Sequence, residues 1–443
     1  MGGSFYWENG PVAHATARSG YRDLVERLNR FPQGAPPSDL LYRILALLFT
    51  EREAGLVALL PVKPFTLATA SRAWKTSPAE TRRTLDALAA RALLLDAERD
   101  GETRWVLPPP MAGFFEFSMM RVRDDVDQKT LARLFYEYLN VGEDFVRELF
   151  ARGETQLGRV FVNEDAVADD DVLQVLDWER ASAVARTARH AAVGVCYCRH
   201  KMSHVGRACG APLEICLTFG TTADSLSRHG FARRIDAAEA LDLLAEARAR
   251  GLVQFGENVR ETVAFVCNCC GCCCEALLAQ KRFGACRPVH TTGFLPEVDA
   301  GRCNGCGACA KSCPVEAMSL RPAADPGVPG RRVANLAAEA CLGCGVCVQA
   351  CRRDALRLVR REERVIPPRD TARRVVRMAL ERGHLADLVF DDRALASHRI
   401  LGTLLGAILR LPPVERALAR EQVKSVYLEK IFEAWERRPG HRA

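Results

Sequence analysis

Eight of the nineteen cysteines in this 443-residue chain fall into two runs with identical spacing. Each run reads Cys-x2-Cys-x2-Cys-x3-Cys, and the first is followed directly by Pro314. At these short intervals three thiolates can surround one face of a cubane iron–sulfur cluster, while the fourth ligates a second cluster. The spacing therefore predicts two 4Fe–4S clusters. The predicted ligand sets are Cys303, Cys306, Cys309 and Cys351 for one cluster, and Cys341, Cys344, Cys347 and Cys313 for the other.

The two runs belong to an internal repeat with a constant offset of 38 positions (341 minus 303). Residues 316–320 recur as residues 354–358, so we expect each half to form a strand, a ligand loop, a short helix and a second strand. On these motifs, residues 293–361 resemble the dicluster bacterial ferredoxin domain. The resemblance implies a ferredoxin-like fold with two 4Fe–4S clusters.

Two features depart from the ferredoxin pattern. Arg352 stands where the second run would usually carry proline, and a Pro/Gly-containing loop (321–330) joins the two halves. Neither departure removes a ligand. Two zinc knuckles are the alternative, because Cys-x2-Cys pairs also bind zinc. Zinc, however, does not account for the closely spaced third and fourth cysteines in both copies.

A second concentration of cysteines precedes the repeat, in two groups that begin at Cys196 and Cys267. The second group has six cysteines in the eight residues 267–274, too many for core packing and an oxidation risk unless thiolates bind metal. Both groups follow expected strands, and α/β folds present ligands at strand ends, so the groups could converge. The candidate metal ligands are Cys196, Cys198, Cys209 and Cys216 for one site, and Cys267, Cys269, Cys270, Cys273 and Cys274 for another.

Three interpretations of these middle cysteines remain open. They could hold one or two further 4Fe–4S clusters. They could form a zinc site in which Cys196 and Cys198 act with His200 or His204, because thiolate and imidazole together suit zinc. They could also be a reactive dithiol or spare thiols. If the second group is helical, the thiols of Cys270 and Cys274 would lie on one face of the helix.

Three basic residues follow the first cysteine pair: Arg199, His200 and Lys201. Beside a cluster they would offset its negative charge and raise its reduction potential. An ordinary solvated basic loop is the alternative interpretation.

The N-terminal part must position these sites, and its pattern is clearest over residues 36–112. Helices are expected over 39–49, 67–74 and 78–91, each preceded by a capping Ser or Thr, and a hairpin is expected around Asp100-Gly101. Three helices followed by a hairpin resemble a winged helix-turn-helix domain. The third helix and the hairpin carry charges of both signs, which favours a docking or packing role over DNA binding.

The whole chain is expected to be a multidomain α+β protein. In the cysteine-rich segment we expect helices over 178–190 and 237–250, and strands over 191–197, 213–219, 252–255 and 262–266. Further helices are expected near 371–382, 393–410 and 413–437. The predicted domains are an N-terminal arm (1–35), a winged-helix-like domain (36–112), a helical connector (113–175), a small α/β metal domain (176–292), a dicluster ferredoxin domain (293–361) and a helical C-terminal region (362–443).

The net charge of +7 permits an acidic partner without demanding nucleic acid. Residues 1–20 lack the apolar stretch of a secretory signal, and no segment reaches the roughly 18 apolar residues of a membrane span. Cysteines clustered at metal spacings without a signal sequence predict a reducing cytoplasm, in an anaerobic or microaerobic setting.

No phosphate-binding loop, dinucleotide fingerprint or nucleophile elbow occurs in the sequence. The chain resembles prokaryotic fusion proteins that join a dicluster ferredoxin domain to a larger cysteine-rich module, and this resemblance implies a redox subunit. We therefore predict one-electron transfer between a soluble donor or partner flavoprotein and a catalytic subunit. A redox-responsive winged-helix regulator and an oxidoreductase with its substrate site at the middle cluster are the alternatives.

Overall fold

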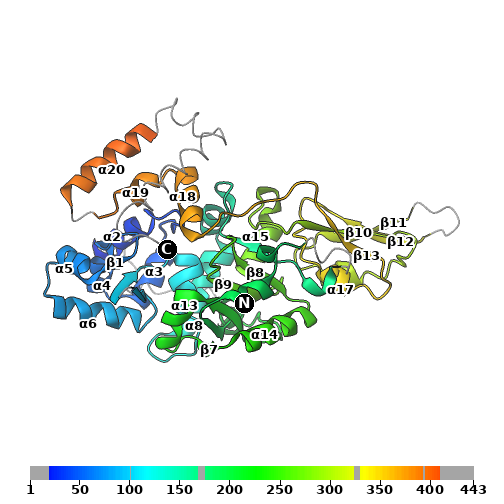
Figure 1. Cartoon of the computed structure of the whole chain (residues 1–443), viewed down its shortest axis with the longest axis horizontal. Coiled ribbons are helices and arrows are strands. Elements are labelled where there is room, and N and C mark those ends of the chain that lie inside the picture. Colours follow the sequence, from blue (N-terminus) through cyan, green and yellow to red (C-terminus); the bar gives the residue numbers. More distant parts are fainter. Residues whose placement is uncertain (1–18, 100, 168–174, 324–329, 393–394, 410–443) are drawn as a thin grey trace, which may run out of the picture.

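The computed structural model describes residues 19–99, 101–167, 175–323, 330–392 and 395–409. Figure 1 shows an elongated arrangement, with a helical N-terminal part at one end, the ferredoxin-like strands at the other and a sheet with its helices between them. Several predictions lie outside the described residues. These are most of the N-terminal arm, the turn residue Asp100, the centre of the 321–330 loop and the helix expected over 413–437.

The N-terminal part has the expected helices and hairpin. The side chains of Ser38, Thr66 and Ser77 accept hydrogen bonds from backbone N–H groups three residues later and so begin three helices. An additional helix begins with a capping box at Thr50. The elements are α2 (Ser19–Leu28), α3 (Asp39–Leu48), α4 (Glu51–Ala58), β1 (Phe65–Thr66), α5 (Leu67–Trp74), α6 (Pro78–Ala89), β2 (Leu95–Arg99) and β3 (Glu102–Val106). The strands form a small sheet in the order β1-β3-β2.

The hairpin of this N-terminal part docks onto the middle of the chain. Asp96 of β2 accepts hydrogen bonds from Ser225 (2.6 Å) and Arg228 (2.7 Å) of helix α13 (Gly220–Arg228). Its carboxylate also lies 3.1 Å from His229 Nε2. Strand β2 of the hairpin is therefore a contact surface within the molecule, packed against α13. The winged-helix resemblance itself stays a prediction.

The connector packs aromatic side chains into the core. The ring of Phe115 packs against that of Phe135 in a tilted arrangement with 4.9 Å between the centroids, and Tyr138 packs in the same way against Phe145 at 5.1 Å. The helical elements are α7 (Phe115–Phe117), α8 (Gln128–Tyr136) and α9 (Asp144–Val146), with wider helical turns at Glu137–Val141 and Arg147–Ala151. Pro110–Phe114 is kinked, because Met111, Ala112 and Gly113 have non-helical dihedrals. The connector is not helical throughout, because β4 (Gly158–Val160) joins the central sheet beside β8 (Val253–Glu257).

The central sheet has six strands in the order β4-β8-β9-β6-β5-β7. Its neighbouring strands are paired antiparallel, so the cysteine-rich segment is an α+β arrangement rather than the expected α/β one. The other strands are β5 (Ala191–Val195), β6 (Glu214–Phe219), β7 (Arg233–Ile235) and β9 (Phe265–Cys269). The helices are α11 (Ala181–Thr187), α12 (Tyr197–His204), α14 (Ala237–Ala249) and α15 (Glu275–Phe283), with short 3-10 turns at Glu164–Ala166, Asp177–Glu179 and Gly284–Cys286.

Two expected strands have different bounds. The first ends at Val195 because helix α12 begins directly after Cys196. The strand expected over 262–266 is displaced to Phe265–Cys269, since Thr262 adopts a positive φ of 50° and Glu257 accepts a hydrogen bond from the N–H of Ala264. This displacement carries Cys267 and Cys269 into the strand itself.

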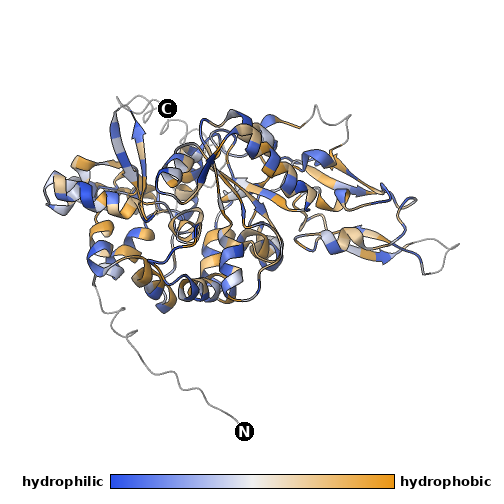
Figure 2. Cartoon of the chain, turned by 90° about the horizontal axis from the view of Figure 1, so that it is seen from below, coloured by the Kyte–Doolittle hydropathy of each residue, from blue (hydrophilic) through white to orange (hydrophobic). Residues whose placement is uncertain are grey.

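The two faces of the sheet carry different cores. Helices α11 and α14 cover one face, where Leu217, Leu244 and Val266 are buried together. The cysteines of β9 belong to the opposite face, which shares the large core of the N-terminal part. In Figure 2 the ribbon is coloured by hydropathy, and hydrophobic residues (orange) occur along the strands and on the helices packed against them.

The ferredoxin-like part has the predicted twofold pattern of strand, loop, short helix and strand. Strand β10 (Phe294–Val298) pairs antiparallel with β13 (Leu356–Arg360), and β11 (Met318–Pro322) pairs with β12 (Arg332–Leu336). The two short helices are α16 (Ala308–Ser312) and α17 (Val346–Gln349).

The C-terminal chain returns to the other end of the molecule (Figure 1). Helix α18 (Thr371–Arg382) has the predicted bounds and is followed by α19 (Leu385–Val389) and α20 (Ala396–Leu409). Arg382 donates to the carbonyl oxygen of Pro32 at 2.7 Å, which ties α18 to the N-terminal part. Among the described residues, no helix is long and apolar enough to cross a membrane.

Candidate iron–sulfur centres

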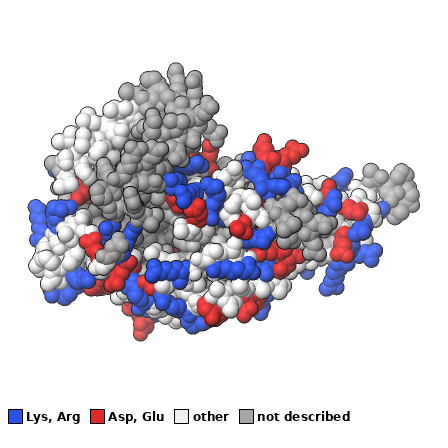
Figure 3. Space-filling view, in the orientation of Figure 1, with Lys and Arg blue, Asp and Glu red and all other residues white. Residues whose placement is uncertain are grey.

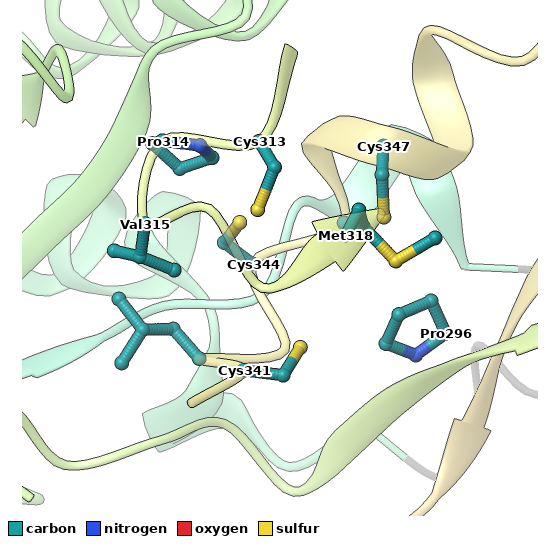
Figure 4. Close-up of a pocket in the computed structure, with 10 residues that line it drawn as sticks. Pro296, Cys313, Pro314, Val315, Met318, Cys341, Cys344 and Cys347 are labelled. Carbon is teal, nitrogen blue, oxygen red and sulfur yellow. The ribbon is translucent and has the colours of Figure 1, made fainter. Parts of the chain in front are cut away.

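The structure brings together the two predicted ligand sets of the ferredoxin-like part. One pocket is lined by Cys313, Cys341, Cys344 and Cys347, and Figure 4 shows their side chains around a common space. We call it the inner pocket. A second pocket, the outer pocket, is lined by Cys303, Cys306, Cys309 and Cys351. The fourth cysteine of each run therefore lies with the other run. Arg352 is exposed, and its substitution for proline leaves Cys351 in the pocket.

Glycines allow the ligand loops to turn this tightly. Gly343 has a φ of +69°, and a Cβ there would lie 2.1 Å from the carbonyl oxygen of Phe294. Gly305 has a φ of +71°, and a Cβ there would lie 2.4 Å from the carbonyl oxygen of Arg332. A side chain at either position would be strained and would collide with backbone.

The cysteine sulfurs accept backbone hydrogen bonds. In the inner pocket, Ala317 N–H donates to Cys313 Sγ at 3.2 Å and Gly343 N–H donates to Cys341 Sγ at 3.3 Å. Two equivalent bonds of 3.4 Å reach Cys303 and Cys351 in the outer pocket. Such bonds stabilise negative charge on sulfur and raise the reduction potential of a bound cluster.

The two pockets differ in exposure. Burial raises the pKa of the Cys341 thiol, and it raises the pKa of Cys344 to about 12. A buried thiolate is therefore costly unless a metal is bound to it, and this donor set fits an iron–sulfur cluster. In the outer pocket, by contrast, Cys306 is exposed to solvent.

The middle cysteines separate into two groups, and they do so differently from the sequence prediction. The first, which we call the four-thiol group, consists of Cys209, Cys270, Cys272 and Cys273, whose sulfurs all lie within 4.8 Å of one another. Cys209 comes from the loop before β6 and the other three from the turn after β9. The prediction placed Cys209 with Cys196, because that loop cannot be positioned from the sequence, and it left out Cys272.

Six of the seven remaining cysteines of this region form a closed circuit, which we call the six-thiol ring. For each thiol, its two neighbours in the circuit are the main cause of the shift in its pKa, and four of the six residues are at most 8% exposed. The order around the ring is Cys196, Cys198, Cys274, Cys269, Cys267, Cys216 and back to Cys196.

Local structure explains the ring. Cys267 and Cys269 lie two residues apart on β9 and therefore point to the same face of the sheet. Neighbouring strand β6 supplies Cys216, and Cys196 and Cys274 stand immediately before helices α12 and α15. Cys270 and Cys274 do not share a helical face as the sequence suggested, because α15 begins only at Glu275 and their thiols enter different groups.

The histidines proposed for a zinc site point elsewhere. His200 Nδ1 lies 2.7 Å from the carbonyl oxygen of Met119, and its Nε2 lies 3.2 Å from His204 Nε2. Both ring nitrogens of His200 are therefore engaged. Cys286, which entered no predicted ligand set, is exposed at the end of α15.

The three basic residues after Cys198 are buried, so the solvated-loop interpretation is wrong. Arg199 interacts electrostatically with Cys196 and Cys269 of the ring and with Cys270 of the four-thiol group. Its guanidinium donates to the carbonyl oxygens of Pro212 (2.8 Å) and Asn268 (2.6 Å), which hold it between the two groups. Arg199 can therefore offset thiolate charge at both groups.

Lys201 serves a different purpose. It forms a fully buried ion pair with Glu275, and Asn140 donates to the same carboxylate at 2.6 Å. Because Lys201 lies on α12 and Glu275 begins α15, the pair joins the helix that carries Cys198 to the helix that Cys274 directly precedes.

The four-thiol group lies directly against the inner pocket. A Cβ at Gly271 would lie 2.3 Å from the carbonyl oxygen of Pro314, so the two backbones are in direct contact. Gly271 follows Cys270, and Pro314 follows Cys313 of the inner pocket. Lys281 also pairs with Glu316 at 2.9 Å across the same boundary.

Comparison with known proteins agrees with the ferredoxin-like part. Residues 302–355 match the family model of the 4Fe-4S dicluster domain. Neither a curated protein nor a solved structure matches the chain. With this match and its further groups of converging cysteines, the chain is a cysteine-rich iron–sulfur protein that carries 4Fe–4S clusters.

Proposed function

We propose that the protein is an electron-transfer subunit whose middle segment exchanges electrons with the two ferredoxin clusters. The contact of Gly271 with Pro314 is the observation that carries this proposal, because it brings the middle cysteines to the ligand loop of the inner pocket. When bound, 4Fe–4S clusters supply one-electron transfer. The protein contributes their spacing, burial and hydrogen bonding.

The packing around this contact supports a fixed geometry. Cys269 and Cys274 of the six-thiol ring belong to the same buried core as Val315, Cys341 and Leu342 of the ferredoxin-like part. Gln280 of α15 also donates to the carbonyl oxygen of Ala340 at 3.3 Å. A continuous core holds neighbouring centres at constant separation, which suits electron transfer better than a flexible linker.

We further propose that the six-thiol ring holds an iron–sulfur cluster. Its sulfur-only donor set suits iron, and Arg199 supplies compensating positive charge. The ring offers two thiols more than the four that a cubane takes, so the iron content distinguishes a cubane from a larger cluster.

The outer pocket is the proposed outlet. Exposed Cys306 brings its ligand loop to the surface, where a redox partner can approach. This gives the sequence of sites a direction, from the buried ring through the inner pocket to the outer one. A partner flavoprotein and a catalytic subunit remain the proposed classes of partner.

Anaerobic iron and sulfide determination, with EPR of the reduced protein, tests the proposal. Loading of the ferredoxin-like part alone gives about eight iron per chain, and a cubane in the ring raises this to about twelve. Cys269→Ser should lower the content from twelve or more toward eight, whereas Cys286→Ser, outside both groups, should not. A wild-type content of about eight would refute a cluster in the ring.

A second candidate, an oxidoreductase acting at the ring, is favoured by one residue. Glu116 of α7 interacts electrostatically with Cys196, Cys267 and Cys274. A carboxyl at this position could deliver protons to a reducible substrate. Glu116→Gln should then abolish reduction of such a substrate, while the iron content and the EPR spectrum of the ferredoxin clusters stay unchanged. Unchanged turnover would remove this candidate.

A further inference from the structure

The sulfur atoms of the four-thiol group lie closer together than those of either ferredoxin pocket. Cys209 Sγ lies 3.5 Å from Cys270 Sγ, and Cys272 Sγ lies 3.7 Å from Cys273 Sγ. All four sulfurs lie within 4.8 Å of one another. Within the part of the chain that the structure describes, no other group of three or more potential ligand atoms is this compact, the two ferredoxin sets included.

This compactness matches a single tetrahedral metal ion. A metal–sulfur distance of about 2.3 Å places the sulfurs of a tetrahedron about 3.8 Å apart, because the tetrahedral edge is about 1.63 times the bond length. In a cubane, each thiolate binds a different iron at a different corner, so the sulfurs spread further apart. The ferredoxin pockets provide that comparison within the same molecule.

We propose that Cys209, Cys270, Cys272 and Cys273 bind one thiophilic divalent ion, Zn²⁺ or Fe²⁺, in a mononuclear tetrathiolate site. Four thiolates leave a net charge of about −2 around a divalent ion, and the electrostatic interaction of buried Arg199 with Cys270 offsets part of it. Cys273 is fully buried and Cys272 is exposed, so the ion can enter from the solvent side.

The position of the site gives each metal a distinct consequence. Cys270 is joined by one peptide bond to Cys269 of the ring and by another to Gly271, which contacts Pro314. Iron here could pass one electron between the ring and the inner pocket by cycling between Fe²⁺ and Fe³⁺. Zinc would cross-link the loop of Cys209 to the turn after β9 without changing its oxidation state.

Metal and sulfide analysis of the anaerobically purified holoprotein separates these outcomes from a cluster. Cys272→Ser should lose about one metal ion per chain and no acid-labile sulfide, because a mononuclear site contains none. Cys286→Ser, the matched exposed control, should lose neither. Loss of about four iron with about four sulfide would show a cubane and overturn the proposal. Unchanged metal content would also overturn it.

X-ray absorption of the wild-type protein gives an answer that does not depend on a variant folding. If zinc is bound, its edge should show four sulfur neighbours at about 2.3 Å and no metal–metal scattering. If iron is bound, anaerobic oxidation should yield the EPR signal of a high-spin mononuclear ferric centre, separate from the cluster signals. Absence of both signatures would refute the site. Neither result depends on whether the six-thiol ring holds a cluster.

Discussion

The contact between Gly271 and Pro314 can be tested by adding a single methyl group. In Gly271→Ala, the new Cβ would lie 2.3 Å from the Pro314 carbonyl oxygen, 2.8 Å from its Cα and 2.9 Å from its carbonyl carbon. Gly271 is outside the left-handed region of φ, so alanine adds no backbone strain. The effect is therefore purely steric, and backbone on both sides prevents its relief by side-chain rotation.

The magnitude follows from the overlap. An ordinary contact begins near 3.4 Å, so the two loops must separate by about 1 Å (3.4 minus 2.3). Overpacking of this kind costs about 1–3 kcal/mol. We expect the thermal midpoint to fall by about 2–10 °C. We also expect weaker magnetic coupling between the cluster proposed for the six-thiol ring and the cluster of the inner pocket, because the distance between them increases.

Gly210→Ala is the matched control. Gly210 lies beside Cys209 in the same region, and a Cβ there has no heavy atom within 4 Å. Both variants should be compared by thermal melting and by EPR of the reduced, anaerobic protein. If Gly271→Ala keeps both the wild-type midpoint and the wild-type spin coupling, the close approach and the electron path built on it are refuted.

Three further predictions concern the supporting structure. Lys201→Met leaves Glu275 buried without its cationic partner and should cost about 3–5 kcal/mol. In thermal melting, Lys201→Met combined with Glu275→Leu should recover most of this loss. Equal melting of the single and double variants would contradict a buried pair. Burial opposes ionisation of Asp96, but hydrogen bonds from Arg228 and a neighbouring serine outweigh it and lower its pKa. This stabilisation is present above the ordinary Asp pKa near 4 and is lost as the pH falls through the lowered pKa of Asp96. The difference in melting temperature between wild type and Asp96→Asn should therefore shrink on acidification below pH 4. A difference that stays constant would contradict the prediction. The holoprotein should show no binding to duplex DNA by fluorescence anisotropy at low salt. The guanidinium of Arg82 on α6 lies over the ring of Trp105, and charges of both signs are interspersed on the face shown in Figure 3. Salt-sensitive DNA binding would contradict this prediction.

The ferredoxin-like part could be read from the sequence because its ligands are set locally. Three of the four cysteines of each pocket lie within seven residues of one another, and the turns between them depend on glycines such as Gly305 and Gly343. The exchange of fourth ligands follows from the repeat itself. Chain connectivity thus determines most of the geometry.

The middle cysteines could not be sorted in the same way. Cys209 and Cys270 are 61 residues apart, and their meeting depends on where one loop folds over the end of β9. One feature of the sequence does indicate the grouping. Cys267 and Cys269 are two residues apart, as residues on one face of a strand are, whereas Cys270 follows the end of the strand. The strand was expected three residues too early, which obscured this alternation.

The placement of Cys313 and Cys351, each in the pocket of the other run, limits how the repeat can change in evolution. Each half of the repeat lacks one ligand for the cluster that its first three cysteines surround. A deletion of either half would therefore leave the surviving cluster with three cysteines instead of four. The duplicated segment cannot be shortened to a complete single-cluster protein without a new fourth ligand, so selection for either cluster preserves both halves.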